Sequence, residues 1–113
     1  GPGTGVAFEE AARRHGDFAM VGAAASVRVE GGTYTDARLV LMGVSDIPVR
    51  CRDAEQVLLS APSGGGVADE AAALAAESIS PPSDLHGTSA YRKHLARVLL
   101  RRAITRATAG GIK

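Results

Sequence analysis

The sequence contains no tryptophan, and its two phenylalanines and two tyrosines make up only 4% of the residues. Aromatic side chains form the cages that hold quaternary ammonium groups and the platforms on which unpaired bases stack. Their scarcity argues against either kind of binding site. A core must be built instead from Ala, Val, Leu and Ile.

Cysteine is nearly absent as well. The single Cys51 excludes an internal disulfide bond and any zinc or iron–sulfur site with several cysteine ligands, as is usual in a reducing compartment. No hydrophobic run approaches the roughly 20 residues of a membrane-spanning helix, and no basic segment followed by an apolar one opens the chain. We therefore expect a cytoplasmic protein without a membrane span.

The length of 113 residues leaves room for one domain. Hydrophobic residues make up 45% of the chain and charged residues 22%, which is ordinary for a folded domain. Residues 1–5 contain three glycines and a proline, a composition typical of a flexible linker or a cloning remnant. We expect a single α+β domain over residues 6–113.

The net charge of +1 conceals an asymmetry along the chain. All 12 acidic residues lie within residues 1–84, together with six Lys and Arg, whereas residues 85–113 contain seven Lys and Arg and no acid. Lys93, Arg97 and Arg101 recur at every fourth position and would line one stripe of a helix. A protein interface or a plain solvated face is favoured over nucleic-acid binding, because the rest of the chain is acidic and no helix-turn-helix or RNA-binding signature is present.

Alternating hydrophobic residues predict an antiparallel hairpin. Residues 19–30 and 33–43 read as two strands joined by Gly31 and Gly32, and residues 47–50, which include Pro48, read as a short edge strand. A two-residue loop would place Val27 opposite Asp36. We favour a three-residue loop with a bulge at the turn, which pairs Val27 with Ala37 and Ala25 with Leu39.

Helical periodicity predicts four helices. The first covers residues 6–15 and ends at Gly16, with acids in its first turn and arginines in its last. The others cover residues 53–59 with Asp53 as the cap, residues 67–79, and residues 89–108 with Thr88 as the cap. In the last helix the expected inward stripe consists of Tyr91, Leu95, Val98, Leu99 and Ile104. This order predicts an α+β fold in which helices flank one face of a small antiparallel sheet of about three or four strands.

Motifs that would carry chemistry are weak in this chain. Gly64-Gly65-Gly66 lacks the Lys-Ser/Thr of a phosphate loop and reads as a connector, and residues 1–6 do not match a dinucleotide fingerprint. His15, His86 and His94 lack the spacing of metal ligands. Cys51 stands between two arginines, but nothing in the sequence places a partner for a nucleophile beside it, so a half-buried structural residue is favoured.

Three segments together resemble a known family. They are Phe8-Glu9-Glu10-Ala11-Ala12-Arg13-Arg14-His15-Gly16-Asp17-Phe18-Ala19, Pro81-Pro82-Ser83-Asp84-Leu85-His86-Gly87 and Tyr91-Arg92-Lys93-His94-Leu95-Ala96-Arg97-Val98-Leu99. In order and spacing they are similar to the C-terminal domain of the FAD-binding medium subunit of aerobic carbon monoxide dehydrogenases. That subunit is shared with the wider xanthine dehydrogenase, or molybdenum hydroxylase, family.

The resemblance implies a role in electron transfer. In such enzymes substrate is oxidised at a molybdenum cofactor in the large subunit, and electrons pass through two [2Fe–2S] clusters in the small subunit to FAD in the medium one. The family's FAD-binding region with its glycine-rich loops lies upstream of the matching domain. This chain is therefore expected to pack beside the flavin, to contribute subunit contacts, and to be inactive and free of FAD when isolated.

The resemblance also implies a cofactor-binding corner. The matching positions are Arg13, Arg14, Gly16 and Asp17, where a cationic pair and a carboxylate at a helix end can bias the charge of reduced flavin. A local ion pair between Arg14 and Asp17 is the structural alternative. For the whole chain the alternative is an independent interaction module whose basic C-terminal helix binds an acidic protein or nucleic acid.

Overall fold

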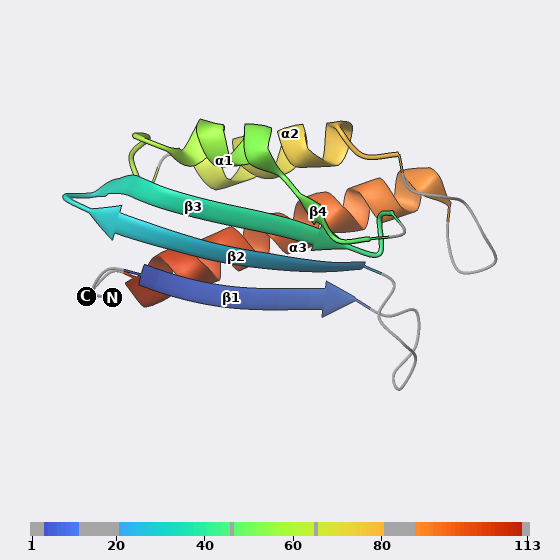
Figure 1. The fold of residues 1–113 in the computed structure, drawn as a ribbon, viewed down its shortest axis with the longest axis horizontal. Coiled ribbons are helices and arrows are strands. Elements are labelled where there is room, and N and C mark those ends of the chain that lie inside the picture. Colours follow the sequence, from blue (N-terminus) through green and yellow to red (C-terminus); the bar gives the residue numbers. More distant parts are fainter. Residues whose placement is uncertain (1–3, 12–20, 46, 65, 81–87, 112–113) are drawn as a thin grey trace.

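The computed structural model describes residues 4–11, 21–45, 47–64, 66–80 and 88–111 (Figure 1). They form a four-stranded antiparallel sheet of order β1-β2-β3-β4 and three helices. The strands are β1 (Thr4–Ala11), β2 (Val21–Glu30), β3 (Thr33–Met42) and β4 (Val49–Arg50), and the helices are α1 (Arg52–Leu58), α2 (Val67–Glu77) and α3 (Ser89–Gly111). The predicted α+β class is confirmed.

All the described helices lie on one side of the sheet. The long helix α3 packs across β1 and β2, α1 packs beside β3, and α2 lies between α1 and α3. The other face of the sheet, turned toward the viewer in Figure 1, is covered by none of the described helices. One face of the sheet is thus the core, and the other is free of the helices that the structure describes.

Strand β1 corrects the prediction of an N-terminal helix. Thr4 to Ala11 pairs residue by residue with β2, from Thr4 opposite Arg28 to Ala11 opposite Val21. Gly5 and Ala7 point inward while Val6 and Phe8 point outward, which is the period of two of a strand. Thr4 and Gly5, which we expected in a flexible opening, are the first residues of this strand. Gly16 lies outside the described residues.

The hairpin between β2 and β3 has the predicted register. Val27 pairs with Ala37 and Ala25 with Leu39. The loop is shorter than predicted, because Glu30 pairs with Thr33 across Gly31 and Gly32, whose φ values of 61° and 78° match the primed turn of tight hairpins. The register shift comes instead from a bulge between Arg28 and Val29, two residue pairs away from the turn.

Strand β4 lies at the sheet edge, as Pro48 predicted. The residue before α1 is Cys51, which makes no side-chain cap; Asp53 lies within the first turn and caps nothing. Helix α2 ends at Glu77, two residues before the predicted end.

Helix α3 begins as predicted but is rotated from its predicted face. The Thr88 hydroxyl accepts a hydrogen bond from the Tyr91 N–H at 3.0 Å, which confirms the cap. Tyr91, expected to face inward, is 47% exposed, and the neighbouring Arg92 is buried and donates to the Gly43 carbonyl at 3.2 Å. Leu99 and Ile104 are buried as predicted.

The core is rich in alanine, which lets α3 approach the sheet closely. Fully buried alanines line both sides of this contact: Ala23 and Ala25 on β2, and Ala96, Ala103 and Ala107 on α3. Larger side chains fill the remaining space, among them Leu39, Leu41, Leu58, Leu100 and Ile104. At the far end the buried Tyr34 hydroxyl lies 2.6 Å from the Thr108 hydroxyl and ties β3 to α3.

Candidate functional site

The four residues of the predicted flavin corner, Arg13, Arg14, Gly16 and Asp17, lie outside the described residues. The two ends of the segment that contains them, Ala11 and Val21, are direct partners in the β1–β2 ladder. The corner therefore stays a prediction, anchored at one known end of the sheet.

Strand β1 is tied to α3 near this end. Arg106 Nη1 lies 2.8 Å from Glu9 Oε2 and 3.5 Å from the Phe8 carbonyl oxygen. This pair joins the edge strand to the last turns of the long helix. It also directs Glu9 toward α3, on the covered side of the sheet.

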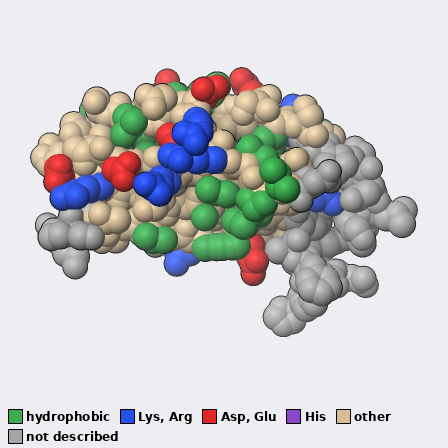
Figure 2. Space-filling view, in the orientation of Figure 1, with side chains coloured by type: hydrophobic (Ala, Val, Ile, Leu, Met, Phe, Trp, Pro, Cys, Tyr) green, Lys and Arg blue, Asp and Glu red, His purple; other side chains and the backbone are tan. Residues whose placement is uncertain are grey.

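The open face of the sheet carries an apolar cluster that sequence reasoning missed. We call it the open apolar face and define it as Val6 and Phe8 on β1, Gly22 and Ala24 on β2, and Val40 and Met42 on β3. Val6 is 75% exposed and Phe8 45%. Figure 2, which looks onto this face, shows hydrophobic side chains gathered beside a group of Lys and Arg side chains.

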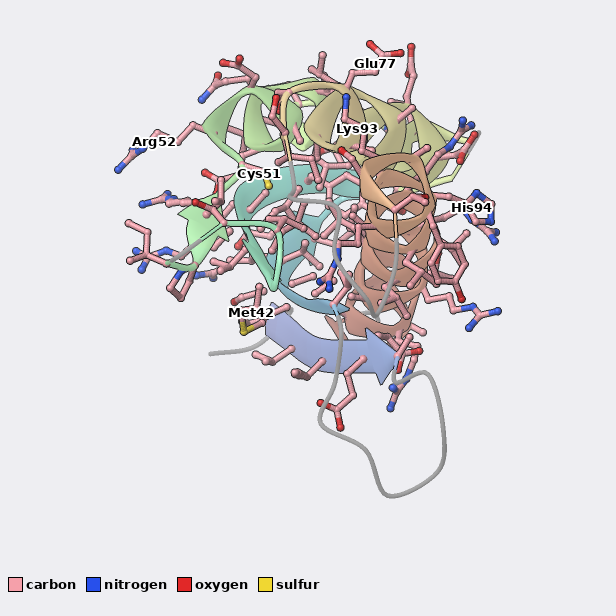
Figure 3. The ribbon with its side chains drawn as sticks, turned by 90° about the vertical axis from the view of Figure 1, so that its right-hand side faces the viewer. Met42, Cys51, Arg52, Glu77, Lys93 and His94 are labelled. Carbon is pink, nitrogen blue, oxygen red and sulfur yellow. The ribbon has the colours of Figure 1, made fainter. Side chains whose placement is uncertain are left out.

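Gly22 makes room for the aromatic ring within this cluster. A Cβ atom at position 22 would lie 3.2 Å from Phe8 Cζ and 3.5 Å from Met42 Cε. The tip of the Phe8 ring therefore lies close to the bare backbone of Gly22. Met42 projects on the side of the sheet opposite α3, whereas His94 projects from α3 away from the sheet (Figure 3).

A second surface lies where α2 meets α3. A hollow of about 470 Å³ is lined by Asp69, His94, Arg97, Val98 and Arg101. Arg97 donates to both oxygens of Asp69, at 3.3 and 2.9 Å, and this hydrogen bonding lowers the pKa of Asp69 and raises that of Arg97. Part of the predicted cationic stripe is thus neutralised within the domain, while Arg101 stays exposed.

A buried carboxylate supports the edge of the sheet. Glu55 on α1 accepts a hydrogen bond from the Leu39 N–H at 3.0 Å and three from the Arg50 guanidinium at 2.9 to 3.2 Å. Burial would raise the pKa of Glu55, but the bonds from Arg50 and Leu39 outweigh it and hold the pKa below its ordinary value. Glu55 thus completes the hydrogen bonding of β3 where β4 is too short to do so.

Cys51 does not lie in the environment of a reactive thiol. It is buried, and burial together with the nearby Glu55 carboxylate raises its pKa to about 11. The structural interpretation of this residue is therefore favoured over a nucleophile. Across the described ranges, no group of His, Cys, Asp and Glu could hold a metal ion.

The N-terminus of α2 is not suited to a flavin pyrophosphate. Gly66, in a left-handed conformation with φ of 82°, leads into α2, but the first turn of that helix carries Asp69 and Glu70. Two carboxylates at a helix N-terminus oppose a phosphate. None of the described helices is long and apolar enough to cross a membrane.

The site geometry defines a class of protein: an α+β domain with two surface patches, one on the open side of the sheet and one where α2 meets α3. The sequence matches the family described as the CO dehydrogenase flavoprotein C-terminal domain over residues 6–107. The chain belongs to this family.

Individual relatives agree with the family match. The chain is 34% identical over 106 residues to 6-hydroxypseudooxynicotine dehydrogenase complex subunit alpha of Paenarthrobacter nicotinovorans, covering 93% of this chain and 36% of that protein. It is 36% identical to the carbon monoxide dehydrogenase medium chain of Afipia carboxidovorans, covering 95% and 37%. The solved structure of quinoline 2-oxidoreductase from Pseudomonas putida 86 superposes with a TM-score of 0.92 at 35% identity, covering 99% and 39%. The chain thus spans little more than a third of the length of these relatives.

Proposed function

We propose that this chain is the C-terminal domain of the FAD-containing medium subunit of a molybdenum-dependent oxidoreductase. In this role it covers the flavin side of the preceding FAD-binding region and contributes subunit contacts during electron transfer. One observation carries the proposal: 95% of the chain aligns with 37% of a carbon monoxide dehydrogenase medium chain. A domain that matches a family's C-terminal part so completely is best understood as the same part of a similar subunit.

The cofactors are distributed accordingly. FAD belongs to the part of the subunit that precedes this domain, where the family resemblance places the glycine-rich loops. Relatives include a xanthine dehydrogenase FAD-binding subunit of Escherichia coli and a carbon monoxide dehydrogenase of Hydrogenophaga pseudoflava whose solved form lacks the Mo-pyranopterin moiety. The molybdenum cofactor and the [2Fe–2S] clusters belong to a large and a small partner subunit, in the cytoplasm. Arg13, Arg14, Gly16 and Asp17 are the residues proposed to lie nearest the flavin edge.

An independent nucleic-acid or acidic-protein module is not favoured. The family match extends through α3 to residue 107. Within α3, Arg92 is buried, Arg97 is paired with Asp69, and Arg106 is paired with Glu9. Much of the positive charge is therefore used within the domain.

The division of cofactors has a direct test. The chain purified alone is expected to be colourless and redox-inactive, while the same domain expressed with its preceding polypeptide should carry about one FAD per chain. Visible absorption and flavin release on denaturation measure both. A stoichiometric flavin in the isolated chain, or none in the intact polypeptide, would contradict the proposal.

The α2–α3 surface has a test of its own. Replacing Arg97 and Arg101 together with Glu should weaken capture of the partner subunits far more than it lowers the thermal midpoint, because both side chains are exposed and exposed charges contribute little to folding. Capture assays and melting curves measure the two effects. Arg52→Glu on α1, another exposed arginine, is the control. Parallel losses of capture and stability would count against an interface at this surface.

A further inference from the structure

Along the strands, the side chains on the outward face of the sheet change from polar to apolar. In the row Thr4, Arg28 and Asp36 the outward side chains are polar, as is usual on the solvated face of an antiparallel sheet. Two rows further along, Phe8, Ala24 and Val40 lie side by side. The open apolar face therefore occupies one half of the sheet, and two outward charged residues lie at its margins, Glu10 beside Gly22 and Arg38 beside Ser26. The other half is an ordinary solvated surface.

Nothing among the described residues covers this half. The helices pack on the opposite face, and Val6 and Phe8 remain 75% and 45% exposed. A contiguous cluster of apolar side chains bordered by polar ones marks an interaction surface, whereas scattered exposed residues do not. The Phe8 side chain, whose far edge reaches Gly22, lies at the centre of this cluster.

We propose that the open apolar face is the surface on which the preceding part of the same polypeptide docks. This inference rests on the proposed function and deepens it by assigning the contact to the sheet, leaving the α2–α3 surface to partner subunits. The docking segment should present apolar side chains to Phe8 and Met42. It should also present a carboxylate to Arg38, which is exposed on the same face next to Val40 and has no ion-pair partner among the described residues.

Chain geometry favours this occupant over a second copy of the domain. The relatives have nearly two thirds of their length outside the matched part, and the matched family is a C-terminal domain. Polypeptide that precedes the domain joins it at β1, which is an edge strand and contributes Val6 and Phe8 to the face. A preceding domain therefore arrives at the border of the apolar cluster, where its high effective concentration favours contact.

Cysteine labelling tests the assignment, because the native Cys51 is buried with a pKa of about 11 and gives little background. Val6→Cys on the open apolar face and Tyr91→Cys on the exposed side of α3 are each compared in the isolated chain and in the intact flavin-containing polypeptide. We expect maleimide to react with the Val6→Cys thiol about tenfold more slowly in the intact polypeptide, and with the Tyr91→Cys thiol at an unchanged rate. Adding Phe8→Asp should restore labelling of Val6→Cys, whereas adding Tyr91→Asp should not.

Three results would overturn the inference. The first is an equal labelling rate of Val6→Cys in the isolated chain and in the intact polypeptide. The second is equal protection of the Val6→Cys and Tyr91→Cys thiols. The third is protection that grows with the concentration of the isolated chain, which would identify a second copy as the occupant. Flavin content is measured on the same samples. If the intact polypeptide holds FAD while Val6→Cys stays fully reactive, only the docking assignment is wrong. If the intact polypeptide lacks FAD, the proposed function is wrong.

Discussion

Replacing Glu55 with alanine is expected to lower the free energy of unfolding by about 3 kcal/mol. The Glu55 side chain is 5% exposed and is the acceptor for both the Leu39 N–H and the Arg50 guanidinium. Its removal leaves a buried backbone donor without a partner at the centre of β3. Urea unfolding followed by circular dichroism measures the loss.

The pH dependence of stability provides a second readout of Glu55. Its pKa lies below the ordinary value of 4.5 in the folded state, so the ionised carboxylate stabilises the fold above that pH. This contribution is lost as the pH falls below 4.5 and through the lower folded-state pKa. Glu55→Gln should therefore flatten the fall in stability over this range.

Asp69→Asn is the matched control for Glu55→Gln. The pKa of Asp69 is also lowered, by Arg97, but its side chain is 48% exposed. We expect a much smaller change in the acid limb of the stability curve. An unaltered acid limb in Glu55→Gln would show that the carboxylate is not the group that titrates.

Leu100→Ala should cost about 3 to 4 kcal/mol, because it opens a cavity where α3 packs on the sheet. Leu100 is fully buried, and its surroundings include many alanines, which have no side-chain freedom with which to fill the space. A domain of this size has roughly 5 to 15 kcal/mol in total, so the variant should be close to unfolding at moderate temperature.

Leu95→Ala is the control, because it makes the same replacement of leucine by alanine on the same helix and so has the same effect on helix propensity. Leu95 is only partly buried, so its truncation should cost less than half as much. Thermal and chemical unfolding of the two variants give the comparison. Equal losses would mean that α3 packs on the sheet through a different stripe.

The hairpin shows what the sequence could predict. The alternation in β2 and β3 is strong, and a one-residue slip would expose Val27 and Leu39, so the register follows from hydrophobic burial alone. The position of the bulge could not be predicted in the same way. A bulge within the ladder and a longer loop at its end produce the same pairing of Val27 with Ala37.

Strand β1 and helix α3 show where local patterns failed. Acids followed by arginines imitate the charge distribution of a helix, but the first strand is specified by pairing with β2, an interaction that no local window contains. Tyr91 was placed inward by its hydrophobicity. Instead, α3 is rotated so that Arg92 is buried and its guanidinium reaches the Gly43 carbonyl.

For the candidate site, sequence motifs identified the family but not the surfaces. Reading residues 6–11 as helix concealed the alternation of Val6 and Phe8 that would have pointed to the open apolar face. Glu55 carried no signal, since its role depends on the Leu39 N–H, 16 residues away.

The start of β1 and the end of α3 lie side by side: a Cβ atom on Gly110 would be 3.9 Å from Gly5 Cα. Polypeptide therefore enters and leaves this domain at nearly one point. A unit attached in this way is a natural candidate for circular permutation, with the old ends joined by a short bridge and new ones opened at the Gly31-Gly32 turn.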